Sequence, residues 1–550
     1  MTNAHNSESS NQTKNTYLQD LAEIKKQQFV AYQLAWNILL ATKNTLYPGF
    51  LLFETKNKAP KPIGARVNNL VKYVVIEDKS DQSMSNLLNE IRWRLNQFAP
   101  VYITPTQFSD LPLDMRKDYI IRLGKYNDTH EYEKLQKVVA EHGIISQSPL
   151  WRDALEHDAD VSLLMEKLRS GILDEQCLEF LDYRGVINKK LKNEIIEIAK
   201  NLFPRYCVAS LNAIKDGRDS DLVIKAFIYD VLYDSLGYED AAALPKVIKV
   251  SGTSFGQGVT ILSAEEILEL RKIDNQQSQI EEIVQLIVKK LTDRGMVCNS
   301  ENILEFLLKG KLAIKEFLPG FGGNSHGLNI VKIHPDDQTN WQYCALMDTT
   351  EIKDEYDRWA GTSIDLSQDL ATTLKGSNLE GKVSQFISSI ELLHYLAGKL
   401  QIDRISEPKD FQSERLLLSG LDWAIISDVK GNKIVKAVEF AGRYPASTNI
   451  ILELKRRQND DEQINKCSYY KTCQTKLSLA SISQNISQFI EYLGVEISEL
   501  DGKSLSSVVS ITGINAKNPD NLVFGLVLYN DFCSEKELII SLLNNFISYI

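Results

Sequence analysis

The glycine-rich stretch at residues 246–262, KVIKVSGTSFGQGVTIL, is the feature that most restricts how this chain can fold. Two runs rich in β-branched residues flank a seven-residue tip, SGTSFGQ, so the pattern predicts a β-hairpin. Three glycines give the backbone of this loop the freedom to turn its N–H groups toward an anion: Gly252, Gly256 and Gly258. Lys249 stands just before the loop, and three residues add hydroxyl groups: Ser251, Thr253 and Ser254. The loop is therefore either a grip for phosphate or a flexible exposed hairpin.

The glycine spacing matches neither of the two common nucleotide motifs. A Walker A loop ends in Gly-Lys-Ser/Thr, which is absent here, and a Rossmann loop opens a helix, whereas this one leads into a strand. The loop alone does not decide between the two alternatives, and the segments that follow it along the chain carry the rest of the argument.

A second predicted hairpin, GLDWAIISDVKGNKIVKAVEF at residues 420–440, places one carboxylate on each strand. If its loop has an even number of residues, Asp422 and Glu439 fall on the same face: directly opposite for a turn at Lys430-Gly431, and diagonal for one at Gly431-Asn432. Two facing carboxylates need a cation between them, and hard oxygen ligands of this kind suit Mg²⁺. The alternative is that Asp422 points to solvent and Glu439 pairs with Lys436 or Arg443.

A third segment, AIKEFLPG at residues 313–320, predicts a strand that ends in a Pro-Gly break. The backbone edge at such a break can bind an adenine ring, and Glu316 can accept a hydrogen bond from its amino group. Alone this signal is weak, because many strands end in Pro-Gly. The order along the chain is what matters: a lysine and a glycine-rich hairpin, a strand ending in Glu-Phe-Leu, and then a hairpin with paired carboxylates.

Composition excludes several classes of function. The net charge of −11 argues against nucleic-acid binding, which depends on Lys and Arg neutralising phosphates. Seven scattered cysteines fit neither a disulfide framework nor a zinc site. The longest apolar run, at residues 29–42, is too short to cross a bilayer, and the polar start lacks the features of a signal peptide. We therefore expect a cytoplasmic protein that acts on neither nucleic acid nor membrane.

The order of the three segments resembles the ATP-grasp superfamily, in which ATP lies between two α+β lobes. The resemblance implies an ATP-grasp fold, of mixed α+β and α/β multidomain type, preceded by an α/β and helical N-terminal region. The composition of residues 1–16, rich in Ser, Asn and Thr, predicts a disordered tail. The resemblance implies three further parts: a pre-ATP-grasp-like region (17–205), the ATP-grasp domain (206–460) and an α+β segment that completes the fold (461–550). The N-terminal layout is similar to the branch that contains peptide and amide ligases.

The resemblance also assigns expected roles to residues. Those that would bind ATP are Lys225, Lys249, Gly252, Thr253, Ser254, Phe255, Gly256, Gly258, Glu316, Phe317 and Leu318. Asp422 and Glu439 would hold Mg²⁺, while Lys249 and Arg443 would stabilise charge on the transferring phosphoryl group and on the intermediate that follows. The implied substrates are a small carboxylic acid and an amine, such as an amino acid or peptide. Members of the superfamily are often dimers, so a homodimer is expected.

One position departs from the superfamily pattern E-Φ-N-x-R, whose Asn is a further magnesium ligand. Here the run is Glu439-Phe440-Ala441-Gly442-Arg443, and alanine cannot ligate a metal. The leading hypothesis is an ATP-dependent carboxylate–amine ligase that forms an amide through an acylphosphate. The alternatives are a carboxylate–thiol ligase acting on coenzyme A or a carrier protein, a nucleotide-binding pseudoenzyme, and a scaffold without a nucleotide site.

Overall fold

The computed structural model describes the chain in segments. They are 13–26, 72–76, 101–103, 119–123, 158–236, 243–251, 258–319, 325–333, 342–353, 359–365, 368–404, 418–428, 430–441, 466–474, 509–515 and 518–529, with single positions after 487. The helices expected at 84–98 and 534–548 lie wholly or mostly outside them. No helix of these segments is long and apolar enough to span a bilayer.

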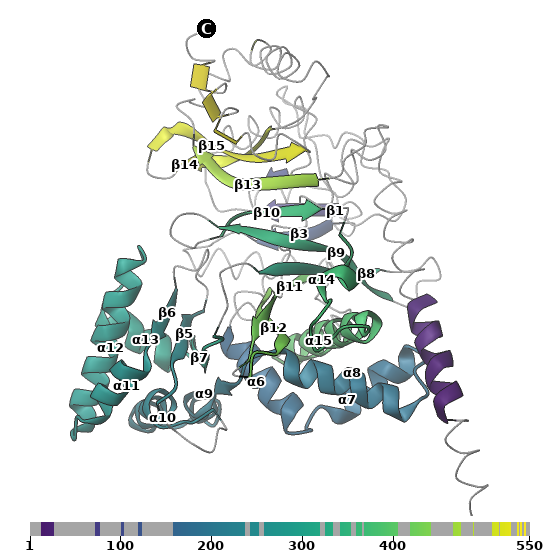
Figure 1. Ribbon diagram of the computed structural model, residues 1–550. Coiled ribbons are helices and arrows are strands. Elements are labelled where there is room, and N and C mark those ends of the chain that lie inside the picture. The colour runs from purple at the N-terminus through teal and green to yellow at the C-terminus, as the bar shows by residue number, and fades with distance from the viewer. Residues whose placement is uncertain are drawn as a thin grey trace, which may run out of the picture.

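The small lobe is a four-stranded antiparallel sheet in the order β4-β7-β5-β6, with helices on one face (Figure 1). The strands are β4 (Tyr206–Cys207), β5 (Lys246–Val250), β6 (Val259–Leu262) and β7 (Leu312–Glu316). The helices are α9 (Ala209–Lys215), α10 (Ser220–Leu232), α11 (Ala264–Arg271), α12 (Gln276–Asp293) and α13 (Ser300–Leu308). The predicted hairpin is confirmed in β5 and β6, and α11 begins with the predicted capping box of Ser263 and Glu266.

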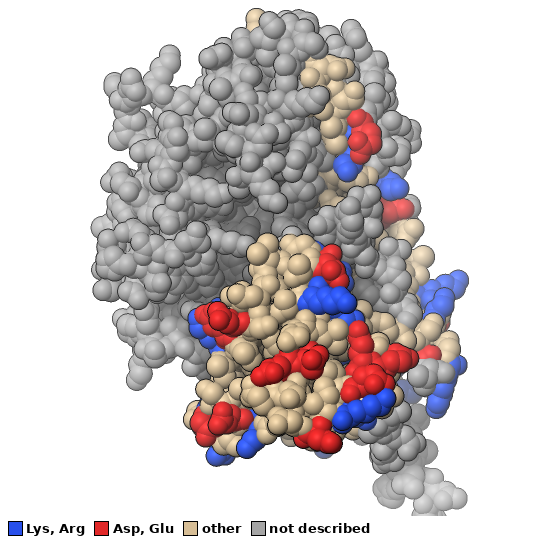
Figure 2. All heavy atoms as spheres, turned by 90° about the vertical axis from the view of Figure 1, so that its left-hand side faces the viewer, with Lys and Arg blue, Asp and Glu red and all other residues tan. Residues whose placement is uncertain are grey.

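The outer face of the small lobe carries acidic and basic side chains side by side (Figure 2). Over the described part of this face the two signs are interspersed, which is the usual character of a solvated surface.

The large lobe is built on an eight-stranded antiparallel sheet in the order β12-β11-β8-β9-β10-β13-β15-β14. Its strands are β8 (His326–Ile333), β9 (Gln342–Lys353), β10 (Trp359–Asp365), β11 (Leu418–Ser427), β12 (Lys433–Ala441), β13 (Lys466–Gln474), β14 (Val509–Asn515) and β15 (Asn518–Tyr529). The segment after residue 461 thus extends the sheet that begins with the predicted carboxylate hairpin.

Helices from two distant parts of the chain cover one face of this sheet at the β11–β12 end. They are α6 (Asp158–Arg169), α7 (Asp174–Tyr183), α8 (Lys189–Leu202) and α15 (Val383–Arg404), and the short α14 (Leu370–Thr373) precedes α15. Their apolar faces share one core with residues of β11 and β12, including the fully buried Trp423.

The N-terminal part contributes two further elements to the described structure. A helix over residues 13–26 packs beside α8, with Tyr17 Oη donating to Glu194 at 2.7 Å. The strands β1 (Lys72–Ile76), β2 (Val101–Ile103) and β3 (Tyr119–Leu123) form a separate parallel sheet in the order β2-β1-β3. The mixed architecture with two α+β lobes is as predicted from the sequence.

Gly361 in β10 lies very close to the backbone of β13. It pairs with Tyr470 across to β13, and a Cβ atom at this position would lie far inside van der Waals contact with the backbone carbonyl oxygen of Tyr469. Replacing Gly361 with alanine should therefore force the two strands apart and lower the free energy of unfolding by about 3 kcal/mol. Chemical denaturation measures this, and Gly376→Ala, at a turn with open space around it, measures the cost of alanine at a positive φ alone.

Asp230 is a buried carboxylate that caps α9. It accepts hydrogen bonds from the N–H groups of Ala209 and Ser210 at 3.0 and 2.8 Å and from Ser210 Oγ at 2.6 Å. Asp230, Cys207 and Asp234 offer three ligand atoms within 4.8 Å of one another. The ammonium of Lys246 interacts electrostatically with all three and donates to the backbone oxygen of Asp230 at 2.5 Å. A cation is thus already built into this cluster, which we interpret as structural.

Burial raises the pKa of Asp230 to about 6 from its ordinary value of 3.8. Because the folded-state pKa is the higher one, stability from this group is fully present below about pH 4 and is lost as the pH rises through 6. The Asn variant does not titrate. We therefore expect the free energy of unfolding of the wild type, relative to Asp230→Asn, to fall by at most roughly 3 kcal/mol between pH 4 and 7. A difference that stays constant over this range in urea titrations would contradict it.

Candidate active site between the two lobes

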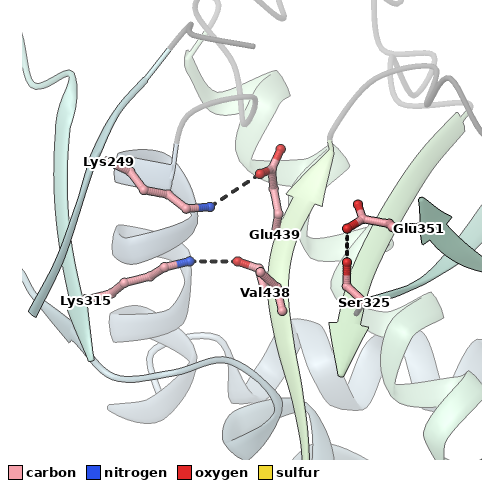
Figure 3. Close-up of polar contacts among 6 residues, drawn as sticks. All are labelled: Lys249, Lys315, Ser325, Glu351, Val438 and Glu439. Atoms are coloured by element: carbon pink, nitrogen blue, oxygen red, sulfur yellow. Dashed lines mark hydrogen bonds and ion pairs between the residues drawn. The ribbon is translucent and has the colours of Figure 1, made fainter. Parts of the chain in front are cut away.

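Two lysines of the small lobe reach the β12 strand of the large lobe (Figure 3). Lys249 Nζ in β5 lies 3.3 Å from Glu439 Oε2, and Lys315 Nζ in β7 donates to the backbone oxygen of Val438 at 2.7 Å. In β5 the even-numbered residues Ile248 and Val250 pack into the helical core, so the alternation of a strand turns Lys249 to the other face. That face of the small sheet is the one that meets the large lobe.

The Lys249–Glu439 ion pair is partly open to solvent. The Lys249 side chain is 10% exposed and that of Glu439 is 46% exposed. Most of the Lys249 side chain is thus buried between the lobes, while the Glu439 carboxylate stays accessible to a ligand from solution. This contact joins the predicted phosphate lysine to a predicted metal ligand, which lie 190 residues apart in the chain.

Asp422 and Glu439 are directly opposite each other on β11 and β12. The predicted reason for this placement, a loop with an even number of residues, is wrong. Ser427 pairs with Lys433, which leaves the odd-numbered loop 428–432, and a β-bulge between Asp422 and Trp423 then shifts the register by one residue. The bulge restores the pairing that the odd loop alone would have lost.

The same bulge decides which way Glu439 points. Val435, Ala437 and Phe440 all belong to the core beneath the sheet, so the inward alternation of β12 skips one residue. Val438 has no register partner, and it packs with Leu318 on the opposite face. Strict alternation would have buried Glu439 beside Ala437; the extra residue turns it toward the cleft and Lys249.

Two more positions complete a row across four strands of the cleft face. Asp422 pairs with Gly327 in β8, and Gly327 pairs with Thr349 in β9. A Cβ atom on Gly327 would lie 2.6 Å from Thr349 Oγ1 and 3.5 Å from Asp422 Oδ1, so glycine leaves the space that these two side chains occupy. Thr349 Oγ1 donates to the Gly327 carbonyl at 3.0 Å. The row presents hard oxygen atoms side by side.

These residues fit a magnesium ion by the chemistry of their donors. Two carboxylates face each other across an antiparallel pair, where Cβ atoms are about 5 Å apart, and like charges at that spacing are unfavourable without a cation. Lys249 supplies one positive charge from the other lobe. Mg²⁺ prefers oxygen ligands and commonly takes one or two carboxylates together with phosphate oxygens. Asp422 and Glu439 are the residues that would hold it.

The predicted adenine hinge follows β7. Glu316 is the last residue of the β7 ladder, so the backbone polar groups of Phe317 and Leu318 lie beyond its last pair. Leu318 is buried against Ala424 and Ile426 of β11, on the same face as Asp422. The hinge therefore rests on the cleft face of the large sheet, two to four residues along β11 from a predicted metal ligand.

The Glu316 carboxylate contacts the segment just before β4. Its Oε2 accepts from the N–H of Arg205 at 3.1 Å, and its own N–H donates to the Arg205 carbonyl at 2.8 Å. Two cations lie near Glu316 because they bind the carbonyl groups at and just after the C-terminus of α8. Lys436 donates to the Asn201 carbonyl. Arg169 donates to the carbonyls of Lys200, Phe203 and Pro204. Burial lowers the pKa of Lys436 and of Arg169, and the charge of Glu316 opposes that shift in both.

Ser251 opens the glycine-rich loop on the same face as Lys249. Its N–H donates to Lys311 O at 2.8 Å, while its hydroxyl is buried and has no hydrogen-bond partner among the described residues. A buried hydroxyl without a partner is uncommon, and a ligand oxygen would satisfy it. Ser251 was noted in the sequence only as one hydroxyl of the loop, and its strand alternation with Lys249 is the signal that singles it out.

The remaining predicted residues have mixed outcomes. The loop residues Gly252, Thr253, Ser254, Phe255 and Gly256 lie outside the described residues, as does Arg443. Gly258 closes the loop by accepting from the N–H of Val250 at 2.8 Å. Lys225 is exposed on α10, and none of the described contacts joins it to Lys249. Ala441 ends β12, opposite Gly420.

Four further residues of this region were not among the predicted site residues. Lys315 is described above, and Ser325 Oγ donates to the Glu351 carboxylate on β9 (Figure 3). His326 begins β8. Its ring stacks on Trp423 with centroids 4.6 Å apart, on the opposite face of the sheet from Asp422.

Comparison with solved structures finds several proteins to which this chain is similar, and three of them follow. The chain is similar to biotin carboxylase from Campylobacter jejuni in complex with β,γ-ATP (9% identity, TM-score 0.36, 85% of this chain and 90% of that one). It is also similar to carboxyaminoimidazole ribonucleotide synthase from Aspergillus clavatus with ATP (11%, 0.32, 87% and 98%). A third is D-alanine–D-alanine ligase from Bacillus anthracis with ATP (12%, 0.28, 72% and 99%).

No protein-family model matches the chain, and no curated protein matches it in sequence. At this level of similarity the comparison assigns no role to any residue here, so the roles below rest on the geometry of the site.

Proposed function

We propose that the protein is an ATP-dependent ligase of the ATP-grasp type that joins a small carboxylic acid to an amine. The observation that carries this proposal is the meeting of Lys249, from the base of a glycine-rich hairpin, with the paired carboxylates Asp422 and Glu439 of the other lobe. The interface of the two lobes then offers a cation for phosphate, a carboxylate pair for magnesium and, for adenine, the backbone beyond the last pair of β7.

The proposed reaction has two steps. A carboxylate oxygen of the acid attacks the γ-phosphorus of ATP, and the bond from that phosphorus to the β-phosphate oxygen breaks to release ADP. The amine nitrogen then attacks the carbonyl carbon of the acylphosphate, phosphate leaves with the bonding pair, and the nitrogen loses a proton. Phosphoryl transfer of this kind depends mainly on positioning and charge neutralisation.

The residues of the cleft divide these tasks. The Lys249 ammonium would neutralise charge that grows on the phosphate oxygens, and Ser251 would donate a hydrogen bond to them. The backbone of Phe317 and Leu318 would bind the adenine edge. Asp422 and Glu439 would hold Mg²⁺, which when bound neutralises phosphate charge and orients the phosphate chain. Arg443 is proposed, from the sequence, to stabilise the intermediate.

The test is release of ADP and phosphate from MgATP in the presence of pooled amino acids and small carboxylic acids. Turnover that needs one acid–amine pair and vanishes in Glu439→Gln would support the ligase and identify its substrates. Turnover that instead needs a thiol acceptor would favour the carboxylate–thiol ligase. Failure of the wild type to bind MgATP in a calorimetric titration would contradict the proposal.

Ala441 is the observation that favours the second candidate, a nucleotide-binding protein without turnover. The position ends β12, two residues after Glu439 on the same strand. If this candidate is right, the wild type binds MgATP without turnover, and Ala441→Asn creates turnover with one of the substrate pools. Turnover by the wild type itself would reject it.

A further inference from the structure

The bulge residue Val438 lies on β12, the edge strand of the large sheet, and its backbone carbonyl makes a contact with the other lobe. Asp422 pairs with Glu439 and Trp423 pairs with Ala437, so Val438 has no partner in the ladder. The extra residue of a bulge leaves its polar groups outside the regular hydrogen-bond pattern, and bulges are common beside active sites. The Val438 oxygen points to the small lobe, where it accepts from Lys315 (Figure 3).

Lys315 is a buried lysine that spans the two lobes. It is only 4% exposed, and its Nζ lies 2.7 Å from the Val438 oxygen. Burying an ammonium is costly unless acceptors hold it, so the side chain favours the arrangement of the lobes in which this carbonyl is within reach.

The two residues of this contact, Lys315 and Val438, each stand next to a predicted site residue in the sequence. Lys315 immediately precedes Glu316, where the hinge begins, and Val438 immediately precedes Glu439. One hydrogen bond therefore joins the residue before the adenine hinge to the residue before a metal ligand. The Lys249–Glu439 ion pair crosses the same interface but is far more exposed, and it must open when phosphate or metal takes its partners.

We propose that Lys315 is a positioning residue that fixes the nucleotide hinge relative to the Asp422–Glu439 pair through the bulge carbonyl of Val438. This inference rests on the proposed function, because it assumes that nucleotide and magnesium bind at these two places. Its consequence is thermodynamic: adenine bound at the hinge and metal held by the carboxylates should strengthen each other, and that coupling should pass through Lys315.

The experiment measures the affinity of the β,γ-imido analogue of ATP by calorimetry, once with Mg²⁺ and once with EDTA. In the wild type Mg²⁺ should strengthen binding, and in Lys315→Met that strengthening should fall by about fivefold to tenfold. Affinity in EDTA should change less. Lys315→Arg keeps a cation that can donate to the carbonyl, so it should recover most of the coupling.

Lys246→Met is the matched control. Lys246 is also a buried lysine whose ammonium donates to backbone carbonyls, those of Asp230 and Val231 at 2.5 and 3.0 Å, but its contacts stay within the small lobe. Its loss should lower the free energy of unfolding at least as much as the loss of Lys315. It should leave the effect of Mg²⁺ on nucleotide affinity unchanged.

Deletion of Val438 tests the other end of the contact. It removes the bulge, yet Glu439 then follows Ala437 and still faces the cleft. The deletion should reduce the coupling as Lys315→Met does, and the two changes together should reduce it no further than either alone.

The outcomes separate the two proposals. If the wild type binds no nucleotide, the proposed function fails, and this inference fails with it. If the wild type shows the Mg²⁺ effect but Lys315→Met retains it in full, or if the double variant shows additive losses, the inference alone is overturned.

Discussion

Replacing Asp422 with asparagine should lower the rate of MgATP turnover by about a thousandfold, while the chain still folds. The amide keeps the shape of the carboxylate and its place in the row with Gly327 and Glu439, but it removes one of the two negative charges that face each other across β11 and β12. Glu439→Gln should have an effect of the same order. Steady-state release of ADP over a range of Mg²⁺ concentrations measures both.

Asp428→Asn is the control for these variants because it makes the same chemical change on the same hairpin. Asp428 lies at the turn, where it accepts from the N–H groups of Lys430 and Asn432, and it stands six residues along β11 from Asp422. Its turnover should stay close to that of the wild type. If Asp428→Asn lost as much turnover as Asp422→Asn, or if Asp422→Asn stayed fully active, the carboxylate pair would not be the metal site.

The pairing of Asp422 with Glu439 shows how far local pattern reaches. Alternating apolar residues around a Gly-Asn turn predict the two strands, and β-strand pairing then brings the carboxylates together. The outcome was predicted correctly and its route was not. An odd loop and a bulge of one residue have the same net effect on the pairing as an even loop. The sequence cannot distinguish these two hairpins, because Val438 is apolar and fits either face of the strand.

Lys315 and Lys225 show where local pattern stops. Lys315 sits in an apolar strand next to the predicted hinge, and alternation alone turns it to the cleft face; its value depends on Val438, which is 123 residues away. Lys225 was chosen for its place before the glycine-rich hairpin, yet it is exposed on α10. The order of motifs along the chain predicts which strands and hairpins form. It does not predict which face of a helix meets the other lobe.

The division into lobes is likewise only partly readable from the chain. β13, β14 and β15 were expected to complete the fold, and they do join the large sheet. The helices α7 and α8 were assigned to an N-terminal region, whereas their apolar residues share a core with α15 and β12, which come much later in the chain. The pattern of an amphipathic helix shows that one face is buried but not which sheet buries it, so closeness in the sequence is a poor guide to such packing.

Replacing Lys249 with methionine should move two measurements in opposite directions. Turnover of MgATP should fall by about a hundredfold to a thousandfold, because the cation that faces the phosphates is lost. The affinity of the free protein for Mn²⁺, used as a spectroscopic substitute for Mg²⁺, should rise by about twofold to fivefold. The reason is that the Lys249 ammonium, 3.3 Å from Glu439 Oε2, competes with a metal ion for that carboxylate until nucleotide arrives.

Lys290→Met supplies the comparison for that variant, since it breaks a lysine–glutamate pair that lies wholly within the small lobe. Lys290 Nζ lies 2.8 Å from Glu266 Oε1, with the two side chains 28% and 30% exposed. It should change neither turnover nor Mn²⁺ affinity. A fall in Mn²⁺ affinity in Lys249→Met would mean that Lys249 helps to assemble the metal site rather than compete for it. Unchanged turnover would remove Lys249, and with it the phosphate end of the cleft, from the proposed mechanism.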